Sequence, residues 1–326
     1  MFKKKIALSI LTVLLASMFT FFLIRLIPGD VVSARAFEIS TAEQIPYDQA
    51  YIRAEQLYGR TAEENVILGY LKYISSIARG DLGESIVYRM PVKDVIVKAV
   101  PWTIFVSSIA ITISFIIGTK LGLYGAHHRK NRKVNGFISI YASITDATPD
   151  FITAIILVMI FAIGLKWLPI RGAYDSAIDP GFSFEFIKSV GYHAILPILS
   201  FVIENLGGWA LLMRSTTTAV LGDEYITVAR AKGLKERTIL KRYVAPNAIL
   251  TPVSMLALRF GAMIGGAALI ENVFAYPGIG FFITRSVADR DYTMIQGLFL
   301  MTTVTMVIAT LVSDVIYMKL DPRVRE

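Results

Sequence analysis

Several kinds of functional site are excluded by what the sequence lacks. Its 326 residues include no cysteine, so neither a disulfide nor a thiolate-bound metal can form. Only three histidines occur, two of them adjacent at His127 and His128, which argues against a histidine-held metal. The phosphate-binding pattern Gly-x-x-x-x-Gly-Lys-[Ser/Thr] is missing, as are His-Glu-x-x-His and Gly-x-Ser-x-Gly. We therefore expect no enzyme activity, cofactor or metal in this chain.

Apolar residues dominate the composition instead. They make up 55% of the chain, whose mean hydropathy of +0.58 is too high for a soluble globular domain. The net charge of +8 does not by itself indicate nucleic acid, because membrane proteins collect lysine and arginine on their inner side. We expect an all-α polytopic protein of the inner or plasma membrane, with lipid and not nucleic acid around it.

Six apolar stretches are long enough to cross a bilayer as helices, which takes about 20 residues. They cover residues 6–24, 102–124, 136–165, 194–213, 250–274 and 293–318. The third stretch has length to spare, so it either protrudes or kinks. Gly118-x-x-x-Gly122 in the second and Gly261-x-x-x-Gly265 in the fifth predict close contact with a neighbouring helix.

Two interpretations of the first stretch stay open. The lysines at residues 3–5 and the run Ala34-Arg35-Ala36 resemble parts of a cleaved signal peptide. However, the apolar core exceeds the usual length of about 7–15 residues, and Arg25 and Pro28 interrupt the path to the cleavage site. We favour an uncleaved first membrane helix.

The charges of the connecting segments predict the orientation. One set of segments holds 18 basic and 5 acidic residues, in residues 1–5, 120–135, 214–246 and 319–326. The other set holds 13 basic and 15 acidic residues, in residues 28–98, 166–193 and 276–292. Because basic residues collect inside, we expect both termini to be cytoplasmic.

The largest predicted external segment, residues 28–98, has helical patterns of its own. Pro46 begins one pattern that Gly59 ends. Thr61 and Glu64 form a capping box before a second pattern. Its apolar stripe consists of Val66, Ile67, Tyr70, Leu71, Ile74 and Ile77.

Three other segments are predicted to lie at or outside the membrane surface. Residues 92–100 alternate apolar and charged side chains in a way that suits the interface, and they lead into Pro101. Residues 166–193 are expected to form a second external loop. Residues 276–292, rich in glycine, are expected to form a short external turn.

Residues 221–252, between the fourth and fifth stretches, predict a helix–glycine–helix elbow. Asp223 and Glu224 precede a helical run, where acidic groups suit the positive end of the helix dipole. Gly233 ends this run, because glycine adopts the left-handed conformation at low cost. A second helical run covers residues 236–244.

The elbow resembles the EAA loop of ABC-importer permeases, most closely the oligopeptide/dipeptide and nickel branch. The resemblance rests on Glu224-Tyr225, Ala229-Arg230-Ala231-Lys232-Gly233 and Pro246. The chain departs from the general pattern at Thr227, Val228, Tyr243 and Ala245. In that family the loop forms a coupling helix that docks on the ATPase. The resemblance thus implies a coupling role for Glu224, Tyr225, Ala229, Arg230, Ala231, Lys232, Gly233 and Leu234.

Other motifs carry the same resemblance. They are Gly80-Asp81-Leu82-Gly83-x-Ser85, Glu271-Asn272-Val273-Phe274-x-x-Pro277-Gly278-x-Gly280, Arg290-Asp291-Tyr292, Gln296-Gly297 and the closing Asp321-Pro322-Arg323. With the elbow, they extend the likeness over residues 79–326.

The resemblance implies a fold, a function and partners. The fold is a six-helix type I ABC-importer permease. The function is translocation in an ATP-driven, binding-protein-dependent importer of oligopeptides or dipeptides, or of nickel or another small solute. The partners are a second homologous permease, two ATP-binding subunits that use ATP and Mg, and an external substrate-binding protein. The chain then divides into a first helix (1–27), an external segment (28–98), a five-helix core (99–318) with its coupling loop (214–250), and a tail (319–326).

Charged residues inside apolar stretches are candidates for the translocation path. At a lipid-facing helix centre each would cost about 2.5–3.5 kcal/mol. Seven charged residues lie in or beside these stretches, namely Arg25, Asp146, Asp150, Glu204, Arg259, Glu271 and Asp314. Arg25, Glu271 and Asp314 lie near span ends and can reach the interface, so the candidates for the path are Asp146, Asp150 and Arg259. Asp146 and Asp150 lie one turn apart around Pro149, so they either line the path and meet a peptide ammonium group, or lie near the inner surface if the span begins at Phe151.

Arg259 lies deepest within its apolar stretch, with no membrane surface closer than two helical turns. It either forms a structural pair with Glu204 or Asp314, or faces the substrate route. We favour the pair.

A function of a different class is a stand-alone secondary transporter or channel. Such a protein needs its own ion relay, for which Asp146, Asp150 and Glu204 are available, and commonly has inverted repeats. We find no repeat in the sequence. The elbow separates the two hypotheses, because Gly233→Asp is expected to preserve insertion and abolish only ATP-coupled uptake.

Overall fold

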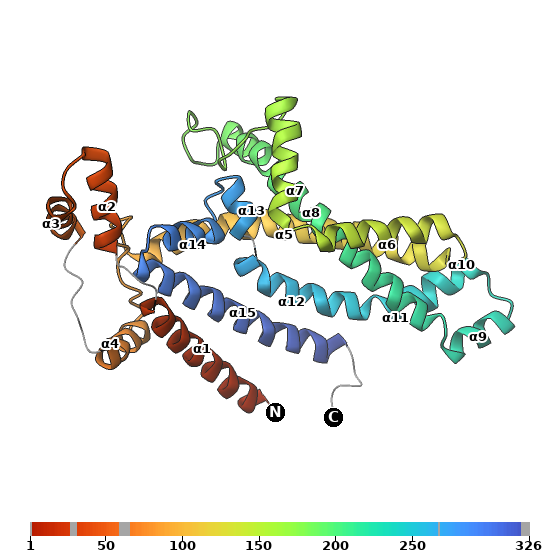
Figure 1. Ribbon diagram of the computed structural model, residues 1–326. Helices are drawn as coiled ribbons and strands as arrows, with labels where there is room; N and C mark the ends of the chain where they lie inside the picture. Colours follow the sequence, from red (N-terminus) through yellow and green to blue (C-terminus); the bar gives the residue numbers. More distant parts are fainter. Residues whose placement is uncertain (1, 27–30, 59–65, 267, 321–326) are drawn as a thin grey trace. The chain divides into compact units, whose positions relative to one another are not determined.

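The computed structural model describes residues 2–26, 31–58, 66–266 and 268–320 (Figure 1). These residues are helical apart from their connections and one isolated bridge between Glu84 and Pro91. The chain forms two compact units, Met1–Pro101 with Gly278–Val307, and Trp102–Pro277 with Ile308–Glu326. Each unit is described by itself.

The first unit contains the amino-terminal helices. They are α1 (Phe2–Arg25), α2 (Val31–Glu43), α3 (Tyr47–Tyr58) and α4 (Val66–Ala78), followed by the first turns of α5 (Val92–His127), then α14 (Ile279–Ala288) and the first half of α15 (Tyr292–Leu320). The predicted helix after Pro46 is confirmed as α3. Helix α2 was not predicted, and it is held against α3 by small buried side chains such as Ala36 and Ala50. The capping box at Thr61 and Glu64 lies outside the described residues.

One prediction about a connecting segment was wrong. The expected turn over residues 276–292 contains helix α14, which is stabilised by its own packing, as where Phe282 meets Tyr88 edge to face at 5.5 Å. The predicted run before Pro101 forms the first turns of α5, which continues through this proline over 36 residues in all.

A buried carboxylate, that of Asp291, joins the loop before α5 to the start of α15. Asp291 is fully buried. Its Oδ2 accepts hydrogen bonds from Ser85 Oγ at 2.5 Å and from the Val87 amide at 3.1 Å, and its Oδ1 accepts one from the Met294 amide at 3.0 Å. The carboxylate thus caps α15 and fixes the loop against it.

The second unit is built around α8 (Phe184–Val220). The other elements are the rest of α5, α6 (Arg132–Ala147), α7 (Asp150–Leu157), the π-helical segment η1 (Val158–Gly164), α9 (Glu224–Ala231), α10 (Glu236–Ile239), the π-helical η2 (Leu240–Val244), α11 (Ala245–Ala248), α12 (Leu250–Gly266), α13 (Ala268–Val273) and the end of α15. Helices α6, α7, α11, α12 and α13 all contact α8. Its buried residues, such as Leu196 and Trp209, provide the core.

The break in the predicted third span is sharper than a kink. Thr148 and Pro149 are both extended, with φ and ψ of −97° and 124°, and of −60° and 136°. The residue before a proline is pushed out of the α-helical region, so α6 ends and α7 restarts at Asp150. The two arms are bent by 99°.

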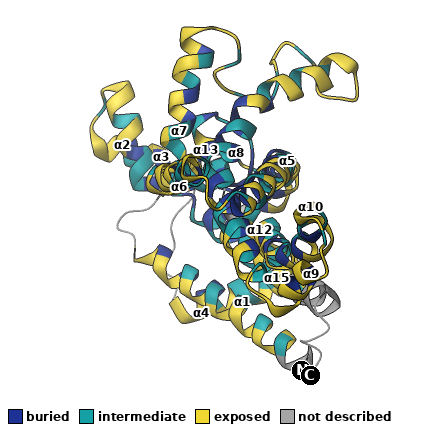
Figure 2. Cartoon of the chain, turned by 90° about the vertical axis from the view of Figure 1, so that its right-hand side faces the viewer, coloured by how far each residue is buried: buried dark blue, intermediate teal, exposed yellow. Residues whose placement is uncertain are grey.

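Four described helices are long and apolar enough to cross a membrane, or five if the bent pair counts as one span. They are Lys5–Arg25, Val92–His127, Phe184–Val220 and Tyr292–Val312, with Arg132–Ala147 and Asp150–Gly164 as the bent pair. The described part of the predicted fifth span consists of α12 and α13. Large apolar side chains are exposed on many of these helices, and Figure 2 shows exposed residues along much of α1 and α7. Such faces suit contact with lipid.

Glycines let α5 and α8 touch through their backbones, as predicted. A Cβ added at Gly118 would lie 2.5 Å from Trp209 Cβ, and one at Gly122 would overlap the carbonyl oxygen of Ala210. Gly261 faces Ala309 of α15 equally closely. Close approach through small residues is a common source of helix association in membranes.

We expect Gly122→Ala to lower the thermal midpoint of the purified protein in detergent. The new methyl group must push apart two backbones, and such overpacking costs about 1–3 kcal/mol. Gly136→Ala is the matched control, because no atom lies within 4 Å of a Cβ at this helical position. There the better helix propensity of alanine should keep the midpoint or raise it. Equal shifts for both variants would contradict the close contact.

Candidate functional site

A polar cavity lies where α6, α7, α8 and α12 face one another, with a volume of about 350 Å³. It is lined by Ala142, Ser143, Thr145, Asp146, Thr148, Asp150, Glu204, Asn205, Gly208, Leu211 and Arg259. All three residues predicted for the translocation path, Asp146, Asp150 and Arg259, are therefore brought together in one cavity. The proline break separates α6 from α7 and places one carboxylate on each side of it.

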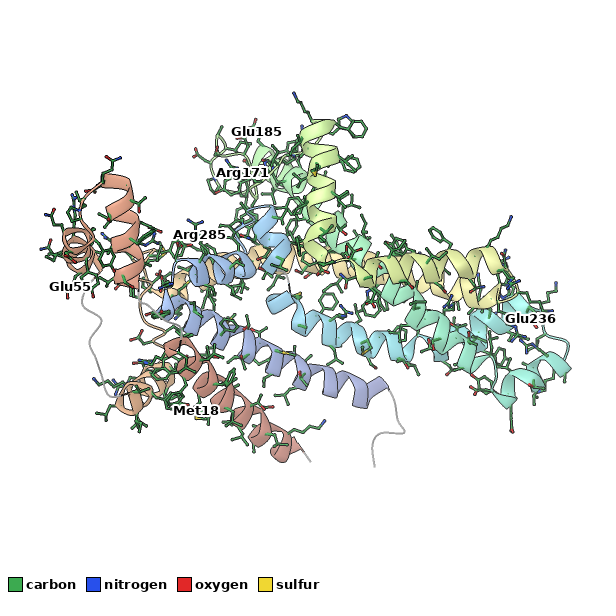
Figure 3. All side chains as sticks on the ribbon, viewed as in Figure 1. Met18, Glu55, Arg171, Glu185, Glu236 and Arg285 are labelled. Atoms are coloured by element: carbon green, nitrogen blue, oxygen red, sulfur yellow. The ribbon has the colours of Figure 1, made fainter. Side chains whose placement is uncertain are left out.

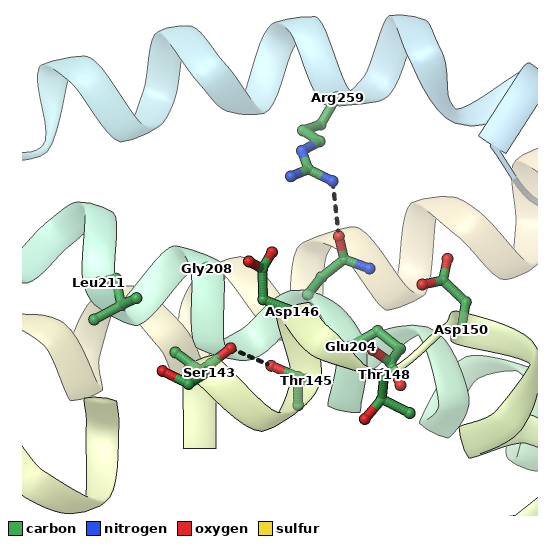
Figure 4. A pocket seen from close by; sticks show the side chains of 11 residues that line it. Ser143, Thr145, Asp146, Thr148, Asp150, Glu204, Gly208, Leu211 and Arg259 are labelled. Carbon is green, nitrogen blue, oxygen red and sulfur yellow. Dashed lines mark hydrogen bonds between the residues drawn. The ribbon is translucent and has the colours of Figure 1, made fainter. Parts of the chain in front are cut away.

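Arg259 extends from α12 toward α8 (Figure 4). Its Nη1 donates a hydrogen bond to Asn205 Oδ1 at 3.0 Å. The amide of Asn205 is oriented for this contact, because its Nδ2 donates to the Phe201 carbonyl at 2.8 Å. Asn205 was not predicted, and nothing in its sequence context distinguishes it from other polar residues in an apolar helix.

The predicted pair between Arg259 and Glu204 was wrong. Among the described residues, no carboxylate lies within 4.0 Å of the guanidinium, which is exposed to the cavity. Glu204 instead accepts a hydrogen bond from Thr153 of α7. Adjacent residues on a helix point in different directions, so α8 can present only one of Glu204 and Asn205 to Arg259. The side chain of Asp314 lies outside the described residues.

A second, smaller cavity of about 130 Å³ shares three residues with the first, namely Asp150, Asn205 and Arg259. Its remaining wall consists of Ser107, Ile111, Phe201, Ala262 and Met263. Ser107 is buried, and its hydroxyl has no hydrogen-bond partner within the described chain. The smaller cavity is thus mostly apolar, with one unsatisfied hydroxyl and the shared charged groups.

The predicted elbow is a compact hairpin of α9 and α10. Gly233 has a φ of +75°. Its amide bonds to the Arg230 carbonyl at 2.9 Å, and the Leu234 amide bonds to the Ala229 carbonyl at 3.3 Å. This pair of bonds is the Schellman arrangement that closes a helix after a left-handed residue. The glycine therefore fixes the direction in which the chain leaves α9.

A small apolar cluster holds the hairpin together. Its buried members are Ile226, Ala229, Ile239 and Val244, and Leu234 packs against them. Ala229 contributes to this packing and has no exposed surface of note, whereas Glu224, Tyr225, Arg230, Ala231, Lys232 and Gly233 are exposed. The exposed set is the part of the predicted coupling residues that a partner can reach.

Arg230 is held within the hairpin. Its Nε lies 2.8 Å from Oε1 of Glu236, the α10 residue labelled in Figure 3. Tyr225 is also tied down, because its hydroxyl accepts a hydrogen bond from Asn247 Nδ2 at 3.2 Å. Glu236 and Asn247 were not predicted as site residues, since their contacts depend on how the hairpin folds back.

The sequence profile of the binding-protein-dependent transport system inner membrane components matches residues 110–326, which include both cavities and the hairpin. The chain belongs to this family. It is therefore a multi-pass inner membrane permease of a transport system that uses a binding protein. As a permease subunit it is not itself an enzyme and carries no cofactor, and ATP is used by a partner ATPase. The expectations on these points are confirmed.

Relatives match the permease over its whole length. It is 28% identical to the oligopeptide transport system permease protein AppB of Bacillus subtilis, over 98% of each chain. It is 28% identical to the di/tripeptide transport system permease protein DppB of Pseudomonas aeruginosa, over 99% of this chain and 97% of that one. It is equally similar to the oligopeptide transport system permease protein OppB of Haemophilus influenzae, over 99% and 98%.

The fold is similar to that of solved transporters. An inward-facing structure of the MetNI methionine ABC transporter aligns with a TM-score of 0.55 and 14% identity, over 70% of this chain and 96% of that chain. An amino acid ABC transporter crystallised with histidines gives 0.52 and 14%, over 70% and 94%. At these identities the likeness concerns the fold, which is that of an ABC-importer permease.

Proposed function

We propose that this permease forms half of the translocation path of an ATP-driven importer of peptides. The observation that carries the proposal is the full-length similarity to permeases named for oligopeptide and di/tripeptide transport. Its partners would be a second homologous permease, two ATP-binding subunits that use ATP and Mg, and an external substrate-binding protein. The path would run between the two permeases and open alternately to each side.

The membrane arrangement is part of the proposal. It has six spans and both termini in the cytoplasm, with the first helix (1–27), the external segment (28–98), the core (99–318) and the tail (319–326) in the order expected from the sequence. The concentration of basic residues around the hairpin supports a cytoplasmic position for it.

The hairpin is the proposed contact with the ATPase. Its glycine-closed turn and its buried apolar cluster make it rigid, and it follows directly on α8, which also lines the cavity. A rigid element joined to a pore-lining helix can pass on the closure of the ATPase as a rigid-body movement. The proposed contact surface comprises Glu224, Tyr225, Arg230, Ala231, Lys232 and Gly233, while Ala229 and Leu234 support it from the apolar cluster.

The polar cavity with Asp146, Asp150 and Arg259 is the proposed part of the path. Charged side chains at membrane depth are costly unless they face protein or water, and here three carboxylates and one guanidinium share a single cavity. A cavity of about 350 Å³ is within the usual range for small-molecule sites, about 300–1,000 Å³.

Purification in mild detergent from the native membrane tests this function. We expect two P-loop ATPases and a second multi-span permease to remain bound, and the reconstituted complex to import peptides only with ATP and the binding protein. Recovery of this chain alone, with transport in liposomes that needs no ATP, would overturn the proposal in favour of a secondary transporter.

A further inference from the structure

The two cavities hold opposite charges that do not neutralise each other. Asp150 and Arg259 belong to both cavities. Arg259 is bound by the neutral amide of Asn205, and Glu204 is bound by the hydroxyl of Thr153. Neutral partners therefore orient both charged groups, and within the described chain Arg259 forms no salt bridge. Each charge is left available to a molecule that enters the cavity.

The guanidinium of Arg259 is equipped to bind a carboxylate. It has five N–H donors in a planar fork that matches a carboxylate in a bidentate way, and the contact with Asn205 involves one nitrogen, Nη1. The smaller cavity adds the Ser107 hydroxyl, which is buried and has no hydrogen-bond partner in the described chain. A buried polar group without a partner carries a cost of about 1–3 kcal/mol, which a ligand oxygen would remove.

The larger cavity is equipped for the opposite charge. Asp146, Asp150 and Glu204 supply carboxylate oxygens, which accept hydrogen bonds from an ammonium group. Figure 4 shows the carboxylates of Asp146 and Asp150 extending into the space toward which Arg259 projects from α12. The apolar wall of the smaller cavity, with Ile111, Phe201 and Met263, suits a side chain next to the carboxylate end.

We propose that these cavities bind the two charged ends of a short peptide, with the α-carboxylate at Arg259 and Ser107 and the α-ammonium group at Asp150 and Glu204. This inference rests on the proposed peptide import and adds a substrate class to it, namely zwitterionic short peptides with both termini free. The permease then contributes to selection after the binding protein has delivered the substrate.

The site is tested by measuring uptake of peptides into liposomes. The liposomes contain the reconstituted complex of both permeases and the ATPases, and the binding protein is added. The probes are the dipeptide Ala-Phe, its C-terminal amide and its N-acetyl derivative. For each variant the kcat/KM ratio between two probes is divided by the wild-type ratio. The selectivity of the binding protein is the same in all complexes and cancels in this quotient.

Arg259→Gln is expected to lower the preference for the free carboxylate over the amide by at least about tenfold, the effect of losing one charge-assisted contact. Its preference for the free over the acetylated amino group should not change. Asp150→Asn should show the reverse pattern. Arg259→Lys, which keeps the charge, should restore part of the carboxylate preference. Arg171→Gln serves as the control, because this exposed arginine lies in the loop before α8 and outside both cavities (Figure 3).

If Arg259→Gln lowers kcat/KM equally for all three probes, the arginine has a purely structural role and the inference is overturned. Unchanged ratios of kcat/KM between the probes in an assembled complex would also overturn it. If the wild-type complex imports none of the probes with ATP, the proposed peptide import fails, and the inference falls with it. Co-purification of the ATPases with each variant separates these results from loss of assembly.

Discussion

Gly233→Val is expected to reduce ATP-driven uptake to less than about a tenth of wild type while the permease still inserts into the membrane. Gly233 has a φ of +75°, a conformation that β-branched residues rarely adopt. No atom lies within 4 Å of a Cβ built at this position, so the backbone, not a clash, produces the effect. Relaxation to a negative φ would break the two amide bonds that close α9 and would turn α10 away from it.

Other residues at position 233 provide the controls. Asparagine tolerates the left-handed region, so Gly233→Asn should retain most of the uptake. Gly233→Asp has a tolerable backbone but adds a negative charge at the carboxyl end of α9, where the helix dipole disfavours it, and we expect its uptake to be abolished or nearly so. Uptake and ATP hydrolysis are measured in liposomes with equal amounts of complex. Wild-type uptake by an assembled Gly233→Val complex would exclude the hairpin from coupling.

Asp291→Ala is expected to destabilise the first unit by at least about 2 kcal/mol, because three donors lose their acceptor and each of the two buried ones costs about 1–3 kcal/mol when left unpaired. The donors are Ser85 Oγ and the amides of Val87 and Met294. Without them, the loop before α5 is no longer fixed to the start of α15. The thermal midpoint of the purified protein in detergent and the rate of proteolytic cleavage within residues 79–91 report the loss.

The matched control is Ser85→Ala, which removes one of the three donors and leaves the carboxylate bonded to two amides. Its effect should be about 1 kcal/mol. If Asp291→Ala lowers the thermal midpoint no more than Ser85→Ala does, the carboxylate does not hold this region together.

Features set by backbone constraints were predictable from the sequence. Pro46 marks the start of α3, Pro149 marks the break between α6 and α7, and Gly233 ends α9 with a positive φ. Gly118 and Gly122 bring α5 and α8 into contact. Each feature depends on a property of one residue, either the fixed φ of proline or the missing side chain of glycine. These properties act independently of the surrounding structure.

Features set by long-range packing were not predictable. Helix α14 forms where a glycine-rich turn was predicted. Its Phe282 packs against Tyr88, which lies almost two hundred positions away in the sequence. The hydrogen-bond partner of Arg259 is Asn205 and not the neighbouring Glu204, because the orientation of α8 about its axis turns Asn205 toward Arg259. The candidate path residues were identified by their cost at membrane depth, but their convergence in one cavity required the fold.

Because α8 is long, a small tilt of this helix moves its carboxyl end by several ångströms. Its 37 residues extend about 55 Å at 1.5 Å per residue, more than the bilayer's full thickness of about 40–45 Å including headgroups. From Asn205 in the cavity wall to the last turn before the hairpin is about 23 Å of uninterrupted helix. Pro197 lies on the other side of the cavity and does not interrupt this arm. A tilt of about 10° around the cavity would displace the hairpin by about 4 Å, so angular changes too small to disturb the cavity walls become a movement that a bound protein can drive or detect.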